Sequence, residues 1–118
     1  MKLVIIEPLG VEKEKLLSMA QEALSGRMEI VYYDTRTTDT NELIQRGEDA
    51  DVIVVSNLSL NGDVIRGCRN LKLLSVAFTG VDHIDMAACR ARGITVCNCA
   101  GYSTCAVADL VFGLLISL

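Results

Sequence analysis

The chain has 118 residues, of which 51% are hydrophobic and 22% charged, and its net charge is −4. This length suits one domain, and the composition is typical of a globular protein and excludes a disordered one. The acidic balance and the lack of any Lys/Arg cluster argue against a nucleic acid or an anionic membrane as partner.

Short apolar runs and helical patterns alternate along the chain. Strands are predicted where β-rich apolar runs occur, at residues 2–6, 28–33, 51–55, 71–78 and 94–97. Helices are predicted where apolar residues follow helical spacing, at residues 11–24, about 40–45, 60–66, 85–92 and 103–118. The first four helices are expected to end at glycines, namely Gly26, Gly47, Gly67 and Gly93.

Strict alternation of strand and helix predicts an α/β fold with a parallel sheet covered by helices on both faces. For five strands, the flavodoxin-like doubly wound order 2-1-3-4-5 is the most common arrangement. Ligands of such sheets bind outside the carboxyl ends of the strands. These ends are residues 7–10, 34–37, 56–59, 78–82 and 98–104.

The stretch from Phe78 to Asp85 carries the most informative turn. It leaves an apolar strand, breaks at Thr79-Gly80 and passes through Asp82 into a helical pattern that Asp82 or Asp85 can cap. Gly80 permits a sharp turn or the close approach of a ligand. Backbone donors at a helix N-terminus attract small anions, so we expect an anion site here.

Other functions of an α/β domain are not supported. Glu7-Pro8-Leu9-Gly10 lacks the Gly/Ser/Thr-rich loop that a phosphate or flavin needs, and its acid would repel a phosphate. No G-x-G-x-x-G dinucleotide motif occurs. A phospho-acceptor domain would need an Asp after the third strand and a Lys after the fifth, where Ser56-Asn57 and Asn98-Cys99 stand.

Five cysteines (Cys68, Cys89, Cys97, Cys99 and Cys105) lack the spacing of a zinc site. We expect reduced, mostly buried thiols and no metal, with Cys105 partly exposed near a helix start. The apolar N-terminal run is too short for a signal peptide, and no stretch reaches the roughly 18 apolar residues of a membrane span. A cytoplasmic location is expected.

Three segments together resemble one enzyme family. Phe78-Thr79-Gly80-Val81-Asp82-His83-Ile84-Asp85, then Arg92-Gly93-Ile94-Thr95-Val96-Cys97-Asn98, then Gly101-Tyr102-Ser103-Thr104 followed by Ala106-Val107-Ala108-Asp109-Leu110, are similar to the N-terminal part of the D-isomer-specific 2-hydroxyacid dehydrogenases. The phosphoglycerate dehydrogenase-like branch is the most similar. The resemblance extends over nearly the whole chain.

The resemblance implies an NAD-dependent oxidoreductase that transfers hydride between nicotinamide and C2 of a D-2-hydroxy acid. Residues 1–102 would form the flavodoxin-like substrate domain. The substrate would contact Ser56, Phe78, Thr79, Gly80 and Val81, with its carboxylate on the backbone amides of the 79–81 turn. Thr79 would also lie beside the nicotinamide end of the cofactor.

In the resembled family, the catalytic Arg, Glu and His and the pyrophosphate loop lie in or after a Rossmann domain, so this chain holds no catalytic residue. Residues 103–118 would begin the helix that leads to that domain and to a homodimer interface. The chain alone is expected to be inactive. His83 is expected to cap or hydrogen-bond the substrate loop. The alternative is a stand-alone flavodoxin-like binding domain without catalysis.

The last helix is apolar on every side, since only Asp109 and Ser117 interrupt apolar residues or Gly after Ala106. Ser103 or Thr104 is expected to cap it. It is too short to span a bilayer, so its burial must come from protein. We therefore expect the chain to self-associate through this helix.

Overall fold

The computed structural model describes residues 1–118 and contains one five-stranded parallel sheet of order β2-β1-β3-β4-β5. This order confirms the flavodoxin-like α/β prediction. The elements in chain order are β1 (Lys2–Ile5), α1 (Lys13–Leu24), β2 (Glu29–Tyr32), α2 (Thr40–Gly47), β3 (Val52–Val55), α3 (Gly62–Gly67), β4 (Leu73–Val76), α4 (Met86–Ala91), β5 (Thr95–Asn98) and α5 (Thr104–Ser117).

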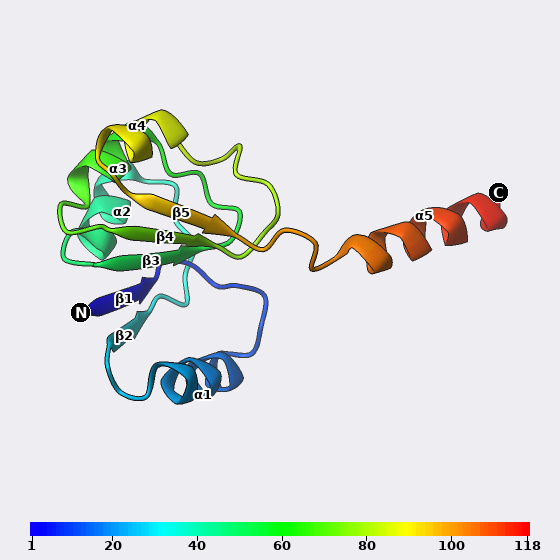
Figure 1. The fold of residues 1–118 in the computed structure, drawn as a ribbon, viewed down its shortest axis with the longest axis horizontal. Helices are drawn as coiled ribbons and strands as arrows, with labels where there is room; N and C mark the ends of the chain where they lie inside the picture. The colour runs from blue at the N-terminus through cyan, green and yellow to red at the C-terminus, as the bar shows by residue number, and fades with distance from the viewer.

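The helices cover the two faces of the sheet unequally. Figure 1 shows α2, α3 and α4 gathered on one face, whereas α1 lies on the other side, near β2. The core lies beneath the three helices and includes Val4, Ile53 and Leu74, which are paired across β1, β3 and β4. On the opposite face Val54 and Leu73 are only half-buried, and α1 contains no buried residue.

Polar side chains fix the starts of the three core helices. Asp39 accepts from the N–H of Glu42 at 2.8 Å, and Asp85 accepts from the N–H of Ala88 at 2.9 Å. Asn61 caps α3 through two N–H groups, each at 3.0 Å. The predicted cap of α5 is wrong, because Ser103 precedes that helix without a side-chain hydrogen bond to it.

Two of the four helix-ending glycines have a packing role. A Cβ on Gly47 would lie 2.7 Å from Sγ of Cys68, and one on Gly67 would lie 2.7 Å from Cγ1 of Ile44. Both glycines are the last residues of their helices, α2 and α3. Glycine is therefore needed there because α2 and α3 approach closely, and larger side chains would separate them.

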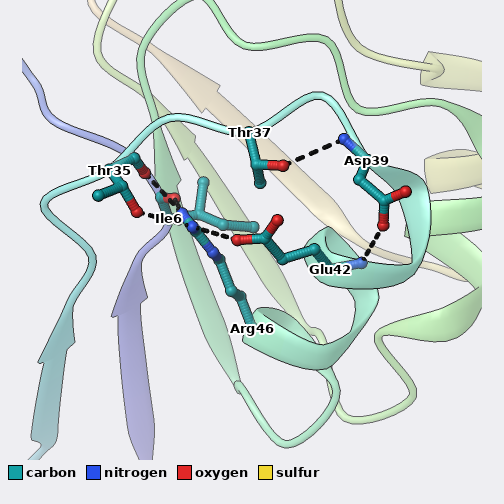
Figure 2. A network of polar contacts seen from close by, with 6 residues as sticks. All are labelled: Ile6, Thr35, Thr37, Asp39, Glu42 and Arg46. Carbon is teal, nitrogen blue, oxygen red and sulfur yellow. Dashed lines mark hydrogen bonds and ion pairs between the residues drawn. The ribbon is translucent and has the colours of Figure 1, made fainter.

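Arg46 joins the carboxyl end of β1 to the connection between β2 and α2 (Figure 2). Its side chain is only 6% exposed. Its Nη1 donates to the carbonyl of Ile6 at 3.0 Å and to that of Thr35 at 2.6 Å, and Glu42 accepts from Nη2 at 2.5 Å. The guanidinium also lies 4.6 Å from the centre of the Tyr33 ring. These bonds satisfy a buried cation and fix both segments.

The last helix, α5, projects away from the rest of the molecule (Figure 1). It contains no buried residue, and its apolar side chains, such as Leu110, Phe112 and Ile116, are exposed. No helix of the chain combines the length and the hydrophobicity that crossing a bilayer requires.

Candidate substrate site at the carboxyl edge of the sheet

A cavity of about 570 Å³ lies where β1, β3 and β4 end. This is the edge at which the sequence predicts ligand binding. None of the lining side chains is charged. They are Pro8, Leu9, Gly10, Val11, Leu16, Ser56, Asn57, Ala77, Phe78 and Tyr102.

The five predicted substrate residues divide into two groups. Ser56, which is 8% exposed, and Phe78, which is 38% exposed, line the cavity. Thr79, Gly80 and Val81 follow Phe78 in the chain and are not part of the lining. Thr79 and Gly80 are exposed, whereas the side chain of Val81 packs against the core.

The turn at Thr79–Val81 presents free backbone donors. None of its three N–H groups donates to an acceptor within the chain. Gly80 does not adopt a left-handed backbone conformation, so a sharp turn is not the reason for a glycine here. The nearest atom to a Cβ on Gly80 would be Oδ2 of Asp82 at 3.9 Å. The missing side chain therefore leaves the donors open to a ligand.

The helix predicted over residues 85–92 forms as α4 with Asp85 as its cap, but it starts too far along the chain to place its N-terminus at this turn. α4 begins only at Met86 and contains 6 residues. Asp82 caps nothing. An irregular loop, which contains the isolated parallel bridge between Ile84 and Leu60, separates β4 from α4. Any attraction for an anion at residues 79–81 comes from loop amides rather than from a helix dipole.

The end of β5 holds the turn in place. Nδ2 of Asn98 donates to the carbonyl of Thr79 at 2.7 Å, and the N–H of Cys99 donates to the carbonyl of Phe78 at 3.0 Å. The hydroxyl of Thr79 donates to the carbonyl of Cys99 at 3.4 Å. These bonds use the carbonyl side of the turn and leave its N–H side free.

Glu7 is fully buried and organises the loop after β3. Its Oε1 accepts from the N–H groups of Ser56 and Leu58, both at 2.9 Å. Its Oε2 lies 3.0 Å from Nη1 of Arg36 in an ion pair without hydrogen-bond geometry. The same Nη1 donates to Oδ1 of Asn57 at 2.5 Å. The carboxylate and the guanidinium together fix this wall of the cavity.

The Arg46 cluster of Figure 2 fixes the backbone next to this ion pair. Arg46 holds the carbonyls of Ile6 and Thr35, which directly precede Glu7 and Arg36 in the chain. A buried, multiply bonded guanidinium thus fixes the backbone on both sides of the Glu7–Arg36 pair. Sequence reasoning gave Glu7 no structural role. A signal was available, since an acid directly after a buried strand needs partners.

Backbone hydrogen bonds also join the two loops of the site. The N–H of Leu60 donates to the carbonyl of His83 at 2.9 Å, and the N–H of Asp85 donates to the carbonyl of Leu60 at 3.1 Å. The bond from Leu60 uses the backbone carbonyl of His83 and not its imidazole, for which the capping or hydrogen-bonding role was expected. Its Nε2 is buried without a partner.

Residues 3–113 match the family of the D-isomer specific 2-hydroxyacid dehydrogenase catalytic domain. The chain belongs to this family. It is 33% identical over 117 residues to a D-3-phosphoglycerate dehydrogenase of Methanocaldococcus jannaschii, covering 98% of this chain and 21% of that protein. It is 34% identical over 112 residues to a hydroxypyruvate reductase of Thermotoga maritima, covering 94% of this chain and 34% of that protein.

A solved structure of a relative has the same fold. The 3-phosphoglycerate dehydrogenase of Entamoeba histolytica, with bound NAD+, superposes with a TM-score of 0.82 at 28% identity. The match covers 98% of this chain and 38% of that chain. The first curated relatives are longer than this chain, which spans 21% to 36% of their lengths.

The cysteines of this dehydrogenase-family domain are all free, but most are not buried as predicted. Cys97, Cys99 and Cys105 are exposed because β5 is an edge strand and α5 is uncovered. Cys68 and Cys89 are buried, and burial raises the pKa of the Cys68 thiol to about 11 and also raises the pKa of Cys89. No three His, Cys, Asp or Glu side chains gather as a metal site.

Proposed function

We propose that residues 1–102 form the substrate domain of an NAD-dependent dehydrogenase that acts on a D-2-hydroxy acid. The observation that supports this most directly is the row of free amides at Thr79–Val81 beside a cavity with uncharged walls. A 2-hydroxy acid has matching parts, namely one carboxylate for the amides and a short remainder for the cavity.

In this proposal the chain binds and orients the substrate. The carboxylate accepts hydrogen bonds from the 79–81 turn, whose position Asn98 and Cys99 fix through the carbonyls of Thr79 and Phe78. The rest of the substrate contacts Ser56 and Phe78. Such preorganised donors lower the cost of aligning C2 for reaction. No residue of this chain is assigned a catalytic role.

The nicotinamide cofactor would contact this chain only at Thr79, and when bound it supplies or accepts the hydride. The connection after β1 does not fit a nucleotide, since Glu7 is buried in it and no glycine-rich cradle surrounds a helix start. The main cofactor site would therefore lie outside residues 1–118.

The test uses the full-length protein with NADH and a panel of 2-oxo acids, followed by NADH absorbance. Turnover of at least one 2-oxo acid is expected. The isolated chain should show neither turnover nor a saturable change in NADH fluorescence. A folded full-length protein without turnover of any 2-oxo acid would overturn the proposal and favour a binding domain without catalysis.

We further propose that α5 leads from the substrate domain toward the cofactor domain and contributes to a homodimer interface. Its exposed apolar residues include Leu114 and Leu115, at 59% and 60% exposure. Contiguous apolar surface of this kind marks an interaction site. Isolated residues 1–118 should dimerise in sedimentation equilibrium, and Leu114→Lys with Leu115→Lys should yield monomers. A monomeric wild-type chain at high micromolar concentration would contradict this.

A further inference from the structure

The loop Ser56–Leu58 has the form of an anion site that is already filled. Two backbone N–H groups, those of Ser56 and Leu58, converge on a single oxygen of Glu7 at 2.9 Å each. Converging loop amides are a common way to bind an external anion. Here the chain supplies its own carboxylate, which is completely buried.

The cations near this edge are also engaged. Arg36 pairs with Glu7 at 3.0 Å and donates to Asn57 at 2.5 Å. Arg46 is buried against backbone carbonyls, and the ammonium of Lys13 lies over the Tyr32 ring at 5.4 Å. The cavity wall itself carries no charged side chain.

We infer that Glu7 acts as an internal anion that makes this domain select 2-hydroxy acids with an uncharged group beyond C2. Phosphorylated substrates are selected against. The inference rests on the proposed function, because it concerns the substrate of that same site. The one anionic group of the substrate, its carboxylate, goes to the Thr79–Val81 amides.

The physical reason is competition for the same donors. A phosphate in the cavity would lie close to the loop Ser56–Leu58, in which the N–H groups of Ser56 and Leu58 already donate to Glu7. It would also approach the Glu7 carboxylate, whose charge is only partly offset by a half-exposed Arg36. Like charges that meet at a binding site oppose binding strongly.

The first experiment compares D-glycerate with 3-phospho-D-glycerate on the full-length protein with NAD+, since the two acids differ only in the phosphoryl group. We expect kcat/KM for the unphosphorylated acid to be larger by at least about tenfold. A preference for the phosphorylated acid would overturn the inference and leave the proposed function standing. If neither acid reacts, the same comparison is made between unphosphorylated and phosphorylated 2-oxo acids. Failure of all of them overturns both.

The second experiment changes the charge of the wall. Val11 lines the cavity and is 48% exposed, so it can accept a longer side chain without disturbing the core. Val11→Lys should shift the kcat/KM ratio toward the phosphorylated acid by roughly tenfold, whereas the matched Val11→Gln should not shift it. Equal kcat/KM ratios in the Val11→Lys and Val11→Gln variants would overturn the inference, because a cation added to the cavity wall would then not favour the phosphorylated acid.

The third experiment removes the internal charge. Glu7→Gln keeps an oxygen that can accept from the loop and leaves Arg36 without its carboxylate partner. The selectivity ratio should again shift toward the phosphorylated acid, and inorganic phosphate should become a better competitive inhibitor. A folded Glu7→Gln variant with the wild-type ratio and wild-type phosphate inhibition would show that Glu7 has only a structural role. If this variant does not fold, the Val11 pair decides.

Discussion

The loop Ser56–Leu58 and the turn Thr79–Val81 follow neighbouring strands and lie at the same edge of the sheet, yet their backbone donors differ. In the loop, the N–H groups of Ser56 and Leu58 are bound by the buried Glu7. In the turn, all three N–H groups are free. The comparison shows that position at the carboxyl edge does not by itself make a ligand site, because neighbouring side chains decide which donors stay open.

The neighbouring strands account for this difference. β3 pairs with β1. Glu7, which follows β1 by two residues, accepts a hydrogen bond from the N–H of Ser56 in the loop. β4 pairs with β5, whose last residue, Asn98, donates to the carbonyl of Thr79, and the next residue, Cys99, donates to that of Phe78. The segment after β1 therefore engages N–H donors of the loop, whereas the end of β5 engages carbonyl acceptors at the turn.

The largest expected effect comes from Glu7→Ala, which should remove the anchor of the loop. It leaves two buried N–H groups without an acceptor, and each unsatisfied group costs about 1–3 kcal/mol, whereas the half-exposed Arg36 can turn to water. Urea unfolding of the wild-type and variant proteins measures this loss. Glu7→Gln, which retains an acceptor, should lose clearly less. Equal stability of Glu7→Ala and wild type would show that the loop does not depend on the carboxylate.

Gly80→Val tests the turn. A Cβ there meets nothing closer than 3.9 Å and the backbone is not left-handed, so the fold should be kept. In the full-length enzyme the branched side chain should crowd the bound carboxylate and lower kcat/KM by about 100-fold, as misplacement at a reacting centre does. Circular dichroism checks the fold. Unchanged kinetics in a folded variant would remove the turn from the site.

A smaller effect is expected from Asn98→Ala, which loosens the turn without touching its donors. One hydrogen bond of 2.7 Å to the carbonyl of Thr79 is lost. This bond is worth about 1 kcal/mol, so KM for the 2-hydroxy acid should rise by roughly fivefold. Asn98→Asp is the matched variant, since it keeps the size and loses the donor, and it should also raise KM. A KM that stays at the wild-type value in both variants would exclude a positioning role.

The smallest effect on activity is expected at the opposite edge of the sheet, where Asp51 accepts from Nζ of Lys72 at 2.7 Å and from the N–H of Lys2 at 2.9 Å. These two donors hold the pKa of the Asp51 carboxyl below its ordinary value of 3.8. The stability that it contributes is therefore complete well above that value and is lost as the pH falls through the lowered pKa.

Asp51→Asn should accordingly lower Tm near neutral pH and weaken the fall of Tm between about pH 5 and about pH 2. It should leave kcat/KM unchanged, because Asp51 is remote from both loops of the site. Thermal unfolding across this pH range measures the change in Tm, and a kinetic assay of the variant measures kcat/KM. A variant with the wild-type pH profile would show that the Lys72 and Lys2 contacts add no stability.

Much of the fold follows from local sequence. Apolar runs such as Val52–Val55 form largely buried strands, and Asp39 and Asp85 begin helices because a carboxylate satisfies free N–H groups. Alternation of these elements then leaves few possible strand orders, and the predicted order is the observed one. The family resemblance, carried by residues 78–110, also depended only on sequence.

Only the tertiary structure decided which polar groups are engaged. Glu7 lies 49 residues from Ser56 in sequence, and no local pattern predicts that its carboxylate accepts from the Ser56 N–H. The isolated parallel bridge between Leu60 and Ile84 likewise joins residues far apart in sequence, and no local pattern predicts it. Local propensity fixes helices and strands because their hydrogen bonds are made within a segment or between paired strands. The donors of a loop are satisfied by whichever distant side chain folding brings beside them.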